Sequence, residues 1–315
     1  MRVAVTWTGG KDCCLALYDV FSQGHEVSTL INFIFTDTEK RTPYKFSNLL
    51  SFILKDFGKF SPYKASILLR YLLETASKNT PKKISTKTHY ILEAASKNTP
   101  KKISTLISYI LRGSESMIWH EVSPEIIAIQ SKAIDIPIIQ RKTTWRTFED
   151  QFKEVMNELK HEGIEGAVWG IAPPGYLTMD NYEKFKDYMQ LMAERDWIYK
   201  VCEELKIEPF LPLWEKSPEQ VLVELIEKGF EVVIVVVNPK ILPEKWLGRK
   251  VNLDFVEDIR KLHRSKGIHV GGDEYHTFVI DGPIFKKRLE IVKSKKMSKG
   301  DYLILNISEV RPVDK

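Results

Sequence analysis

The residues best suited to chemistry stand near the start of the chain, where a short apolar segment leads into a glycine turn. Adjacent glycines let the backbone turn sharply and approach a ligand closely, because neither carries a Cβ atom. A helix beginning near Asp12 would add the unpaired amides and positive dipole end of its first turn. Lys11 supplies a cation for a pyrophosphate, and Asp12 a carboxylate for Mg²⁺. We therefore predict a phosphate-binding loop made of Thr8, Gly9, Gly10, Lys11, Asp12 and Cys13.

The spacing of this loop separates it from two common phosphate-binding motifs. A Walker A loop needs Gly-x-x-x-x-Gly-Lys-Ser/Thr, and a dinucleotide-binding turn needs Gly-x-Gly-x-x-Gly. Neither pattern occurs in the chain. The loop follows the first predicted strand directly, which is where open α/β sheets bind phosphates.

Hydrophobic patterning predicts the elements that must position this loop. Strands and helices alternate outside residues 38–115, as is typical of an α/β protein whose parallel sheet has helices on both faces. The carboxyl ends of the strands bind ligands in such sheets, so the loops after Thr8, Asn32 and Gly170 should surround one nucleotide. Helices are expected after a capping box at Thr147 and after Ser217-Pro218. The expected strands are 2–7, 27–34, 136–141, 166–171, 208–213 and 231–238.

The character of the chain changes after about Trp214. A helix at 254–262 and strands near 275–281, 286–294 and 301–309 indicate a smaller α+β domain, which would cover the nucleotide site. We therefore predict a nucleotide-binding domain at 1–214 and a substrate-binding domain at 215–315.

A basic insert interrupts the first predicted domain at 38–115, where 15 Lys and Arg stand against 5 Asp and Glu. Residues 43–118 form a tandem repeat of period 19, with prolines in register at 43, 62, 81 and 100. Each unit is predicted to form one helix, with a hydroxyl N-cap and Pro at the first position. Two interpretations stay open: a surface that contacts RNA or an acidic partner, or a recently amplified stretch tolerated as a loop extension.

The overall composition limits the class of protein. A chain of 315 residues with 43% hydrophobic content can bury the cores of two domains. The longest apolar run, 232–237, is too short to cross a bilayer, and no signal peptide precedes the first strand. We therefore expect a cytoplasmic protein without membrane contact. Cys13, Cys14 and Cys202 show neither disulfide nor metal-ligand spacing, so reduced thiols and no structural zinc are expected.

Three further stretches accompany the loop, at 117–122, 194–214 and 246–283. The last contains Glu-Tyr-His-Thr at 274–277 and Asp-Gly-Pro at 281–283. The loop is similar to the Ser-Gly-Gly-Lys-Asp-Ser loop of the PP-loop ATP pyrophosphatases. With these stretches, residues 1–37 and 116–285 resemble the diphthine–ammonia ligase family, in its archaeal form. The resemblance implies a Rossmann-like, HUP-type sheet.

The resemblance also implies a reaction that uses ATP and Mg²⁺. The carboxylate of diphthine, a modified histidine of elongation factor 2, would attack the α-phosphate of ATP and release pyrophosphate. Ammonia would then displace AMP and leave the amide, diphthamide. Forming an amide from carboxylate and ammonia is uphill in water, so the acid must first gain a good leaving group while pyrophosphate is held by cations and amides.

The residues implied by the resemblance lie in the loop and in the predicted strand near 275. Alternation along that strand sends residues 274 and 276 to one face. Glu274 could orient ammonia or take its proton, and His276 could bind the imidazole-derived group of diphthine or a phosphate. The alternative to a functional role for Glu274 and His276 is a hydrogen-bonded strand end. The alternative for Arg195 is a solvated ion pair. The implied catalytic residues are Lys11, Asp12, Glu274 and His276, and the implied substrate-binding residues are Glu274, His276, Thr277 and Arg195, with Asp12 near Mg²⁺.

Two departures from the family pattern concern the site. Cys13 replaces the last Ser of the loop, which exchanges a hydroxyl for a weakly bonding thiol. Residues 271–273 read Gly-Gly-Asp where the family has Glu-Gly-Gly or Glu-Asn-Gly, so Asp273 would have to replace a carboxylate. Trp7 and residues 31–34 either border adenine or belong to the core.

Two alternative functions stay open at this point. A PP-loop enzyme of the tRNA-thiolation type would adenylate a base carbonyl, but such enzymes commonly carry Cys-x-x-Cys pairs, which this chain lacks. A nucleotide-binding adaptor without catalysis would use the basic insert to bind RNA or ribosomes.

Overall fold

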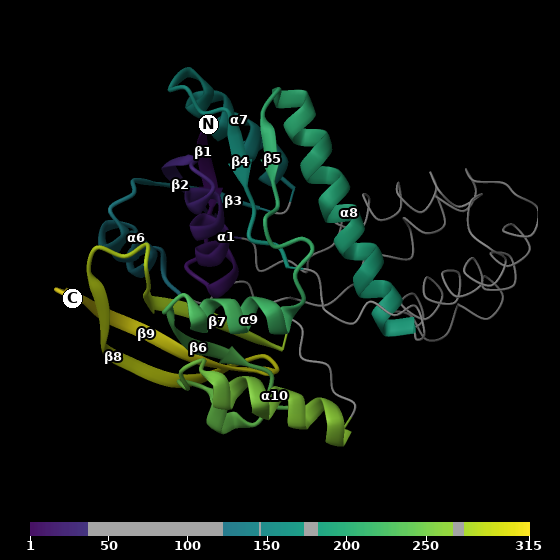
Figure 1. Cartoon of the computed structure of the whole chain (residues 1–315), viewed down its shortest axis with the longest axis vertical. Coiled ribbons are helices and arrows are strands. Elements are labelled where there is room, and N and C mark those ends of the chain that lie inside the picture. Colours follow the sequence, from purple (N-terminus) through teal and green to yellow (C-terminus); the bar gives the residue numbers. More distant parts are fainter. Residues whose placement is uncertain (37–121, 145, 173–181, 267–273) are drawn as a thin grey trace, which may run out of the picture.

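The computed structural model describes residues 1–36, 122–144, 146–172, 182–266 and 274–315 (Figure 1). The predicted basic insert at 38–115, the whole tandem repeat at 43–118, and Gly271-Gly272-Asp273 lie outside the described residues. None of the helices in the described ranges combines the length and the hydropathy that a bilayer crossing requires.

A five-stranded sheet forms the first half of the structure, in the order β3-β2-β1-β4-β5. Every neighbouring pair is parallel. This confirms the predicted α/β class and the predicted Rossmann-like parallel sheet, and the observed order places β1 in the middle. The strands are β1 (Arg2–Thr6), β2 (Glu26–Phe35), β3 (Ile138–Thr143), β4 (Gly166–Val168) and β5 (Glu208–Phe210).

Helices cover both faces of this sheet (Figure 1). Successive residues of β1 point to opposite faces: Val3 and Val5 pack with α1 and α6, whereas Ala4 packs with α7 and α8. Strands buried on both sides are apolar throughout, which explains why the sequence shows runs rather than alternation. The helices are α1 (Lys11–Ser22), α6 (Pro124–Ile134), α7 (Phe148–His161) and α8 (Tyr182–Leu205).

A second, antiparallel sheet follows in the order β7-β6-β9-β8. Two helices and a short 3-10 turn accompany it, as expected for the smaller α+β part of the chain. The strands are β6 (Glu231–Val237), β7 (Tyr275–Asp281), β8 (Arg288–Lys299) and β9 (Tyr302–Val313); the helices are α9 (Pro218–Glu227), η2 (Glu244–Trp246) and α10 (Leu253–Lys266).

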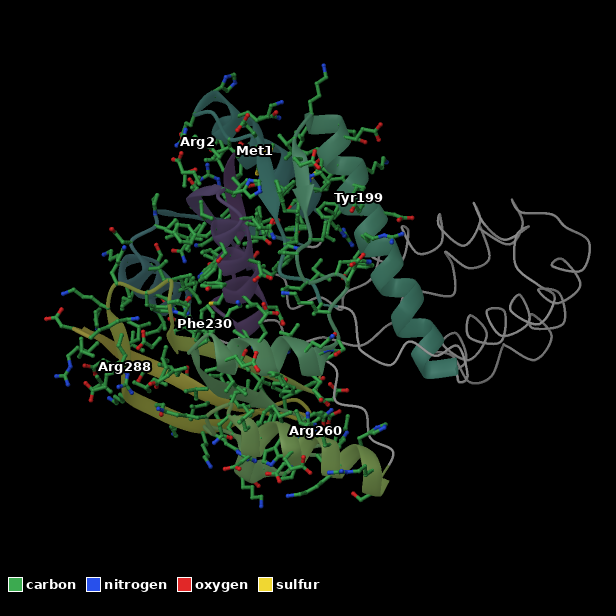
Figure 2. All side chains as sticks on the ribbon, in the orientation of Figure 1. Met1, Arg2, Tyr199, Phe230, Arg260 and Arg288 are labelled. Carbon is green, nitrogen blue, oxygen red and sulfur yellow. The ribbon has the colours of Figure 1, made fainter. Side chains whose placement is uncertain are left out.

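The two sheets share one hydrophobic core, because a single cluster of buried residues runs from Val3 on β1 to Val310 on β9. Phe230, just before β6, lies near α1 (Figure 2). Its ring is edge-on to that of Tyr18 of α1, with 6.0 Å between ring centroids. Lys216 adds a polar link, with its Nζ 2.6 Å from Asp19 of α1 and 2.7 Å from a Glu224 oxygen of α9. The second sheet therefore packs on the face of the first that carries α1 and α6.

The two predicted helix starts differ in the structure. Ser217 forms the expected capping box with Gln220. The prediction for Thr147 is wrong: α7 begins at Phe148, but Thr147 makes no side-chain bond to its first turn. Its hydroxyl lies instead 3.2 Å from that of Thr143 and 3.0 Å from that of Thr144. Neighbouring hydroxyls in the preceding loop compete successfully for the cap.

Candidate functional site

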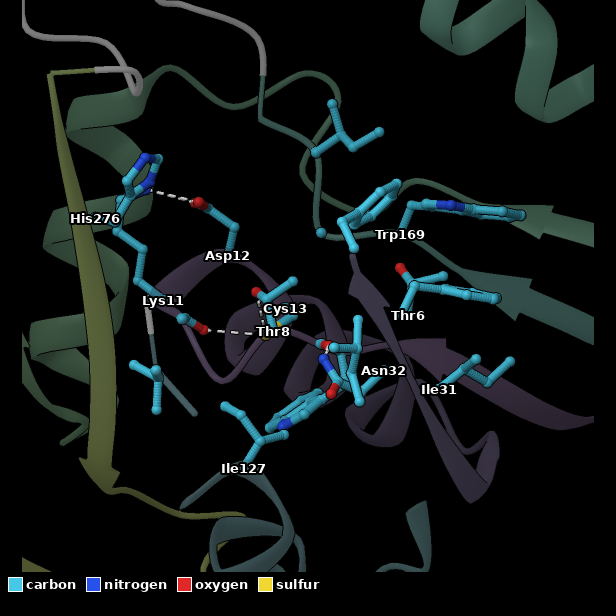
Figure 3. A pocket seen from close by; sticks show the side chains of 18 of the residues that line it. Thr6, Thr8, Lys11, Asp12, Cys13, Ile31, Asn32, Ile127, Trp169 and His276 are labelled. Carbon is cyan, nitrogen blue, oxygen red and sulfur yellow. Dashed lines mark hydrogen bonds and ion pairs between the residues drawn. The ribbon is translucent and has the colours of Figure 1, made fainter. Parts of the chain in front are cut away.

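A cavity of about 360 Å³ opens at the carboxyl ends of β1, β2 and β4 (Figure 3). The segments after these strands, which the sequence predicted to meet, all contribute to its lining, and so does β7 of the second sheet. Residues from α6, α7 and α8 complete the wall. The lining comes mainly from residues 6–8, 10–13, 31–35, 169–171 and 275–277.

The phosphate-binding loop predicted at Thr8–Cys13 connects β1 to α1. Gly9 has a φ of +77°, a left-handed conformation that favours glycine, and an added Cβ would lie 2.6 Å from Ile127. Gly10 is the N-cap of α1 and provides no side chain to cap it. The N-terminus of α1, with its positive dipole end, therefore faces a cavity that Gly10, Lys11 and Asp12 line.

Gly170, directly after β4, lies against the same turn. A Cβ added there would stand 2.5 Å from the amide nitrogen of Cys13 and 2.7 Å from the carbonyl oxygen of Asp12. Both neighbours are backbone atoms of the first turn of α1, so they cannot move aside as a side chain would. Gly170 permits the close approach of two backbones at this edge of the cavity.

Lys11 and Asp12 form an ion pair at the polar end of the cavity. The ammonium lies 2.7 Å and 2.9 Å from the two carboxylate oxygens of Asp12 and 5.6 Å from the centre of the Tyr275 ring. Lys11 is only 8% exposed. Burial opposes its charge, but Asp12 and Tyr275 outweigh this and raise the pKa of Lys11 above its usual value. The site therefore holds a permanent, partly neutralised cation.

Cys13, which replaces the usual Ser, keeps a polar environment. Its Sγ donates to the carbonyl of Gly10 at 3.2 Å and lies 3.6 Å from the hydroxyl of Thr8. Burial disfavours the thiolate, yet hydrogen bonds from Cys14 and Thr8 lower the pKa of Cys13. Burial raises the pKa of Cys14 well above its usual value. The two adjacent thiols therefore differ in acidity: the Cys13 thiol is the more acidic.

Strand β7 binds the loop through both its backbone and its side chains. The amide of Lys11 donates to the hydroxyl of Thr277 at 3.0 Å, and the amide of Val279 donates to the carbonyl of Gly9 at 3.0 Å. His276 lines the cavity beside them. Tyr275 is buried, which raises its pKa to about 12. Tyr275, His276 and Thr277 all line the cavity, so lining does not follow strict alternation along this strand.

Two predicted site residues lie elsewhere among the described residues. Glu274 does not line the cavity, and its carbonyl accepts the amide of Asn238 at 2.8 Å. Arg195 does not line it either: its guanidinium lies 3.5 Å from Asp196 and 5.2 Å from the ring centre of Trp214. The cavity receives Glu194 and Trp197 from that helix instead.

The opposite end of the cavity is apolar and aromatic, with Trp169 and Ile31 on the side away from Lys11 (Figure 3). Trp7 and Ile31, for which the sequence left a core or a ligand role open, are each 1% exposed. They are core residues with an edge at the cavity. Asn32 keeps the backbone there in place, because its Nδ2 donates to the carbonyl of Trp7 at 2.9 Å. A charged end and an aromatic end suit a ligand that is itself polar at one end and flat at the other.

Sequence reasoning missed Gln130 and Gly170. Gln130 of α6 is fully buried and contacts the loop. A signal existed, because Gln130 stands at a helical spacing from Ile126 and Ile127, inside the apolar stripe of α6. The sequence placed Gly170 in a loop beside the cavity but did not predict its contact with α1. No local pattern could predict that contact, because the first turn of α1 is distant from Gly170 in the chain.

The charges at the polar end fit a pyrophosphate with a divalent cation. The Lys11 ammonium and the start of α1 favour an anion, and the Asp12 side chain is 32% exposed. Among the described residues no group of three His, Cys, Asp or Glu side chains could hold a metal alone. Mg²⁺ is commonly held by one or two carboxylates and substrate phosphates, which is the set available here.

Comparison with known proteins finds related sequences at both ends of the chain. Residues 1–51 match the model of the diphthamide synthase N-terminal domain, and residues 217–313 match that of the diphthamide synthase C-terminal domain. Diphthine–ammonia ligase from Homo sapiens is 27% identical over 195 residues, covering 58% of this chain and 67% of the human protein. The enzyme from Danio rerio is 24% identical over 200 residues, covering 59% and 73%.

A solved structure of a predicted subunit of tRNA methyltransferase from Methanocaldococcus jannaschii is also similar. It has a TM-score of 0.32 and 11% identity, covering 90% of this chain and 98% of the other. The first 51 residues and residues 217–313 match the N-terminal and C-terminal domain models of one family, in that order along the chain. Sequence similarity near both ends of the chain therefore supports its membership of the diphthine–ammonia ligase family.

Proposed function

We propose that the protein amidates diphthine on elongation factor 2 to diphthamide, using ATP and ammonia. The observation that carries the proposal is the polar end of the cavity. There the buried ammonium of Lys11 pairs with the partly exposed Asp12 at the start of α1, next to β7, which lies in the segment that matches the C-terminal domain model. This arrangement favours a triphosphate in the first half of the chain and leaves the second half to present an acceptor.

The proposed reaction has two steps. A carboxylate oxygen of diphthine attacks the α-phosphorus of ATP, and the bond to the β-phosphate oxygen breaks, releasing pyrophosphate. Ammonia then attacks the acyl carbon of the mixed anhydride, loses a proton, and expels AMP. Lys11 and the first-turn amides stabilise the charge that gathers on the departing pyrophosphate.

The roles of the individual residues are part of the proposal. Asp12 would share Mg²⁺ with the phosphates, and His276 would meet the acceptor or a phosphate at the cavity wall. Thr277 would act through the loop rather than on substrate, because its hydroxyl accepts the Lys11 amide. Glu274 and Arg195 stay predictions, since neither lines the cavity.

The wider setting is proposed on the same basis. We infer a nucleotide-binding domain at 1–214 and a substrate-binding domain at 215–315, acting on elongation factor 2 in the cytoplasm. A contact between RNA and the basic insert at 38–115 stays a prediction, because the insert lies outside the described residues.

The test is a release assay with ATP, Mg²⁺, ammonium and elongation factor 2 that carries diphthine. Equal amounts of AMP and pyrophosphate should appear together with a 1 Da loss in the mass of the factor, as an amide replaces an acid. Omitting ammonium should block the mass change. Release that requires undermodified tRNA would instead support a thiolation-type enzyme, and binding of ATP without release would support an adaptor.

A further inference from the structure

Gln130 of α6 connects three parts of the molecule that meet behind the phosphate loop. Its Nε2 donates to the carbonyl of Gly9 at 3.1 Å and to the carbonyl of Val279 on β7 at 2.7 Å. Its Oε1 accepts the indole N–H of Trp7 at 2.9 Å. Gln130 is 0% exposed, so none of these bonds can be replaced by solvent.

The indole of Trp7 fixes which end of the Gln130 amide faces the loop. An indole N–H only donates, so the amide oxygen must face Trp7 and the NH₂ group must face the two carbonyls. Gly9 and Val279 have carbonyl oxygens there, and only a donor satisfies them. Each partner thus requires the same orientation of the amide.

The bond to Gly9 controls the direction of the next amide in the loop. Gly9 receives two donors on one oxygen, from Gln130 and from the backbone of Val279. A trans peptide is planar, so a carbonyl held toward α6 and β7 sends the N–H of Gly10 to the opposite side. Gly10 lines the cavity.

We propose that Gln130 is a positioning residue for phosphate binding: it holds the Gly9–Gly10 peptide in the orientation that presents the Gly10 amide to a ligand phosphate. This inference rests on the proposed function, because it assumes that the loop binds the phosphates of ATP. The need for it follows from the glycines themselves. A peptide between two glycines rotates with little steric resistance, so an outside clamp must select one orientation.

The experiment compares three ligands on Gln130→Met, which keeps the length of the side chain and removes its donors. Affinities for ATP, pyrophosphate and AMP are measured by calorimetry with Mg²⁺. Loss of an amide that contacts a charged phosphate should weaken ATP and pyrophosphate by about 10- to 100-fold. AMP, which lacks the departing diphosphate, should change by less than about twofold.

Ser131→Ala is the matched control, because Ser131 is the next residue of α6, is 3% exposed, and bonds the carbonyl of Ile136 at 2.6 Å. It should lower the melting temperature and leave all three affinities unchanged. Trp7→Phe is the milder variant should Gln130→Met fail to fold, because it removes the donor that orients the amide and leaves Gln130 itself in place. It should weaken ATP and pyrophosphate in the same direction, by about two- to fivefold.

Three outcomes would overturn the inference. Unchanged pyrophosphate affinity in Gln130→Met, or in Trp7→Phe where only that variant folds, would show that the clamp does not act on phosphate binding. An equal loss for AMP and pyrophosphate would give Gln130 a purely structural role. Wild-type protein that binds neither ATP nor pyrophosphate would remove the proposed function and the inference with it. Wild-type binding with unaffected variants removes the inference alone.

Discussion

The phosphate loop and strand β7 wall the same end of the cavity, but they contribute different chemistry. The loop offers backbone amides at the start of α1 and one ion pair, Lys11–Asp12. Strand β7 offers groups that hold the loop: the hydroxyl of Thr277 and the amide of Val279 bond Lys11 and Gly9. The comparison shows that the amides and the ammonium expected to bind phosphate come from the first sheet, whereas the β7 groups that hold the loop come from the second, so these two sets of groups can be changed separately.

The largest effect is expected from the loop itself. Lys11→Ala removes the buried ammonium that faces the departing pyrophosphate, and we expect ATP-dependent pyrophosphate release to fall by about 10²- to 10³-fold. Pyrophosphate release is measured with the full set of substrates. Lys153→Ala removes an ammonium that pairs with Glu149 and Glu204 on α7 and α8, and it should leave the rate unchanged. A Lys11→Ala rate equal to that of wild type would refute the role of the loop.

The next effect concerns the support of the loop by β4. Gly170→Ala places a Cβ 2.5 Å from the Cys13 nitrogen, so the first turn of α1 must shift. We expect a loss of about 1–3 kcal/mol in the free energy of unfolding and weaker ATP binding. Gly229→Ala is the control, because it strains a left-handed residue at φ +78° with no neighbour within 4 Å. It should lower the free energy of unfolding without changing the affinity for ATP. An equal loss of ATP affinity in both variants would contradict the role of Gly170 in supporting the loop.

A smaller effect is expected from β7. Thr277→Val keeps the shape of the side chain and removes the acceptor of the Lys11 amide. An unpaired buried amide costs about 1–3 kcal/mol, seen as a lower unfolding free energy in urea and a raised KM for ATP. Thr277→Ser restores the hydroxyl and should restore KM. A Ser variant as impaired as the Val variant would show that the methyl group, rather than the hydroxyl, matters.

The smallest effect is a difference in thiol reactivity within the loop. Hydrogen bonds lower the pKa of Cys13, whereas burial raises that of Cys14 and raises that of Cys202 to about 12. A thiol titrates to its reactive form as pH rises through its pKa, so Cys13 should be alkylated at the lowest pH of the three. Peptide mass mapping after iodoacetamide treatment between pH 7 and 10 measures this. Mg²⁺ with ATP should protect Cys13, and faster labelling of Cys14 would contradict the assignment.

Much of the loop and the first sheet could be predicted from sequence, because their signals are local. Gly9, Gly10 and Lys11 stand together, and apolar runs mark the strands, so the loop and the parallel direction of the strands could be predicted; the order of the strands in the sheet was not predicted. The position of Glu274 and Arg195 could not be predicted, since facing a cavity depends on how the second sheet packs against α1. The Thr147 cap failed for a similar reason: the competing hydroxyls of Thr143 and Thr144 act through loop geometry that spacing does not encode.

The shared core has a consequence for the history of the chain. One apolar cluster extends from Val3 to Val310. Dividing the polypeptide near residue 214 would therefore leave two fragments, each with an apolar face exposed to water. We expect neither fragment to fold stably alone, and therefore neither to be encoded as a separate protein. We expect the two halves to be inherited together. Insertions should be tolerated in loops within each half, between its helices and strands, rather than at the junction of the halves.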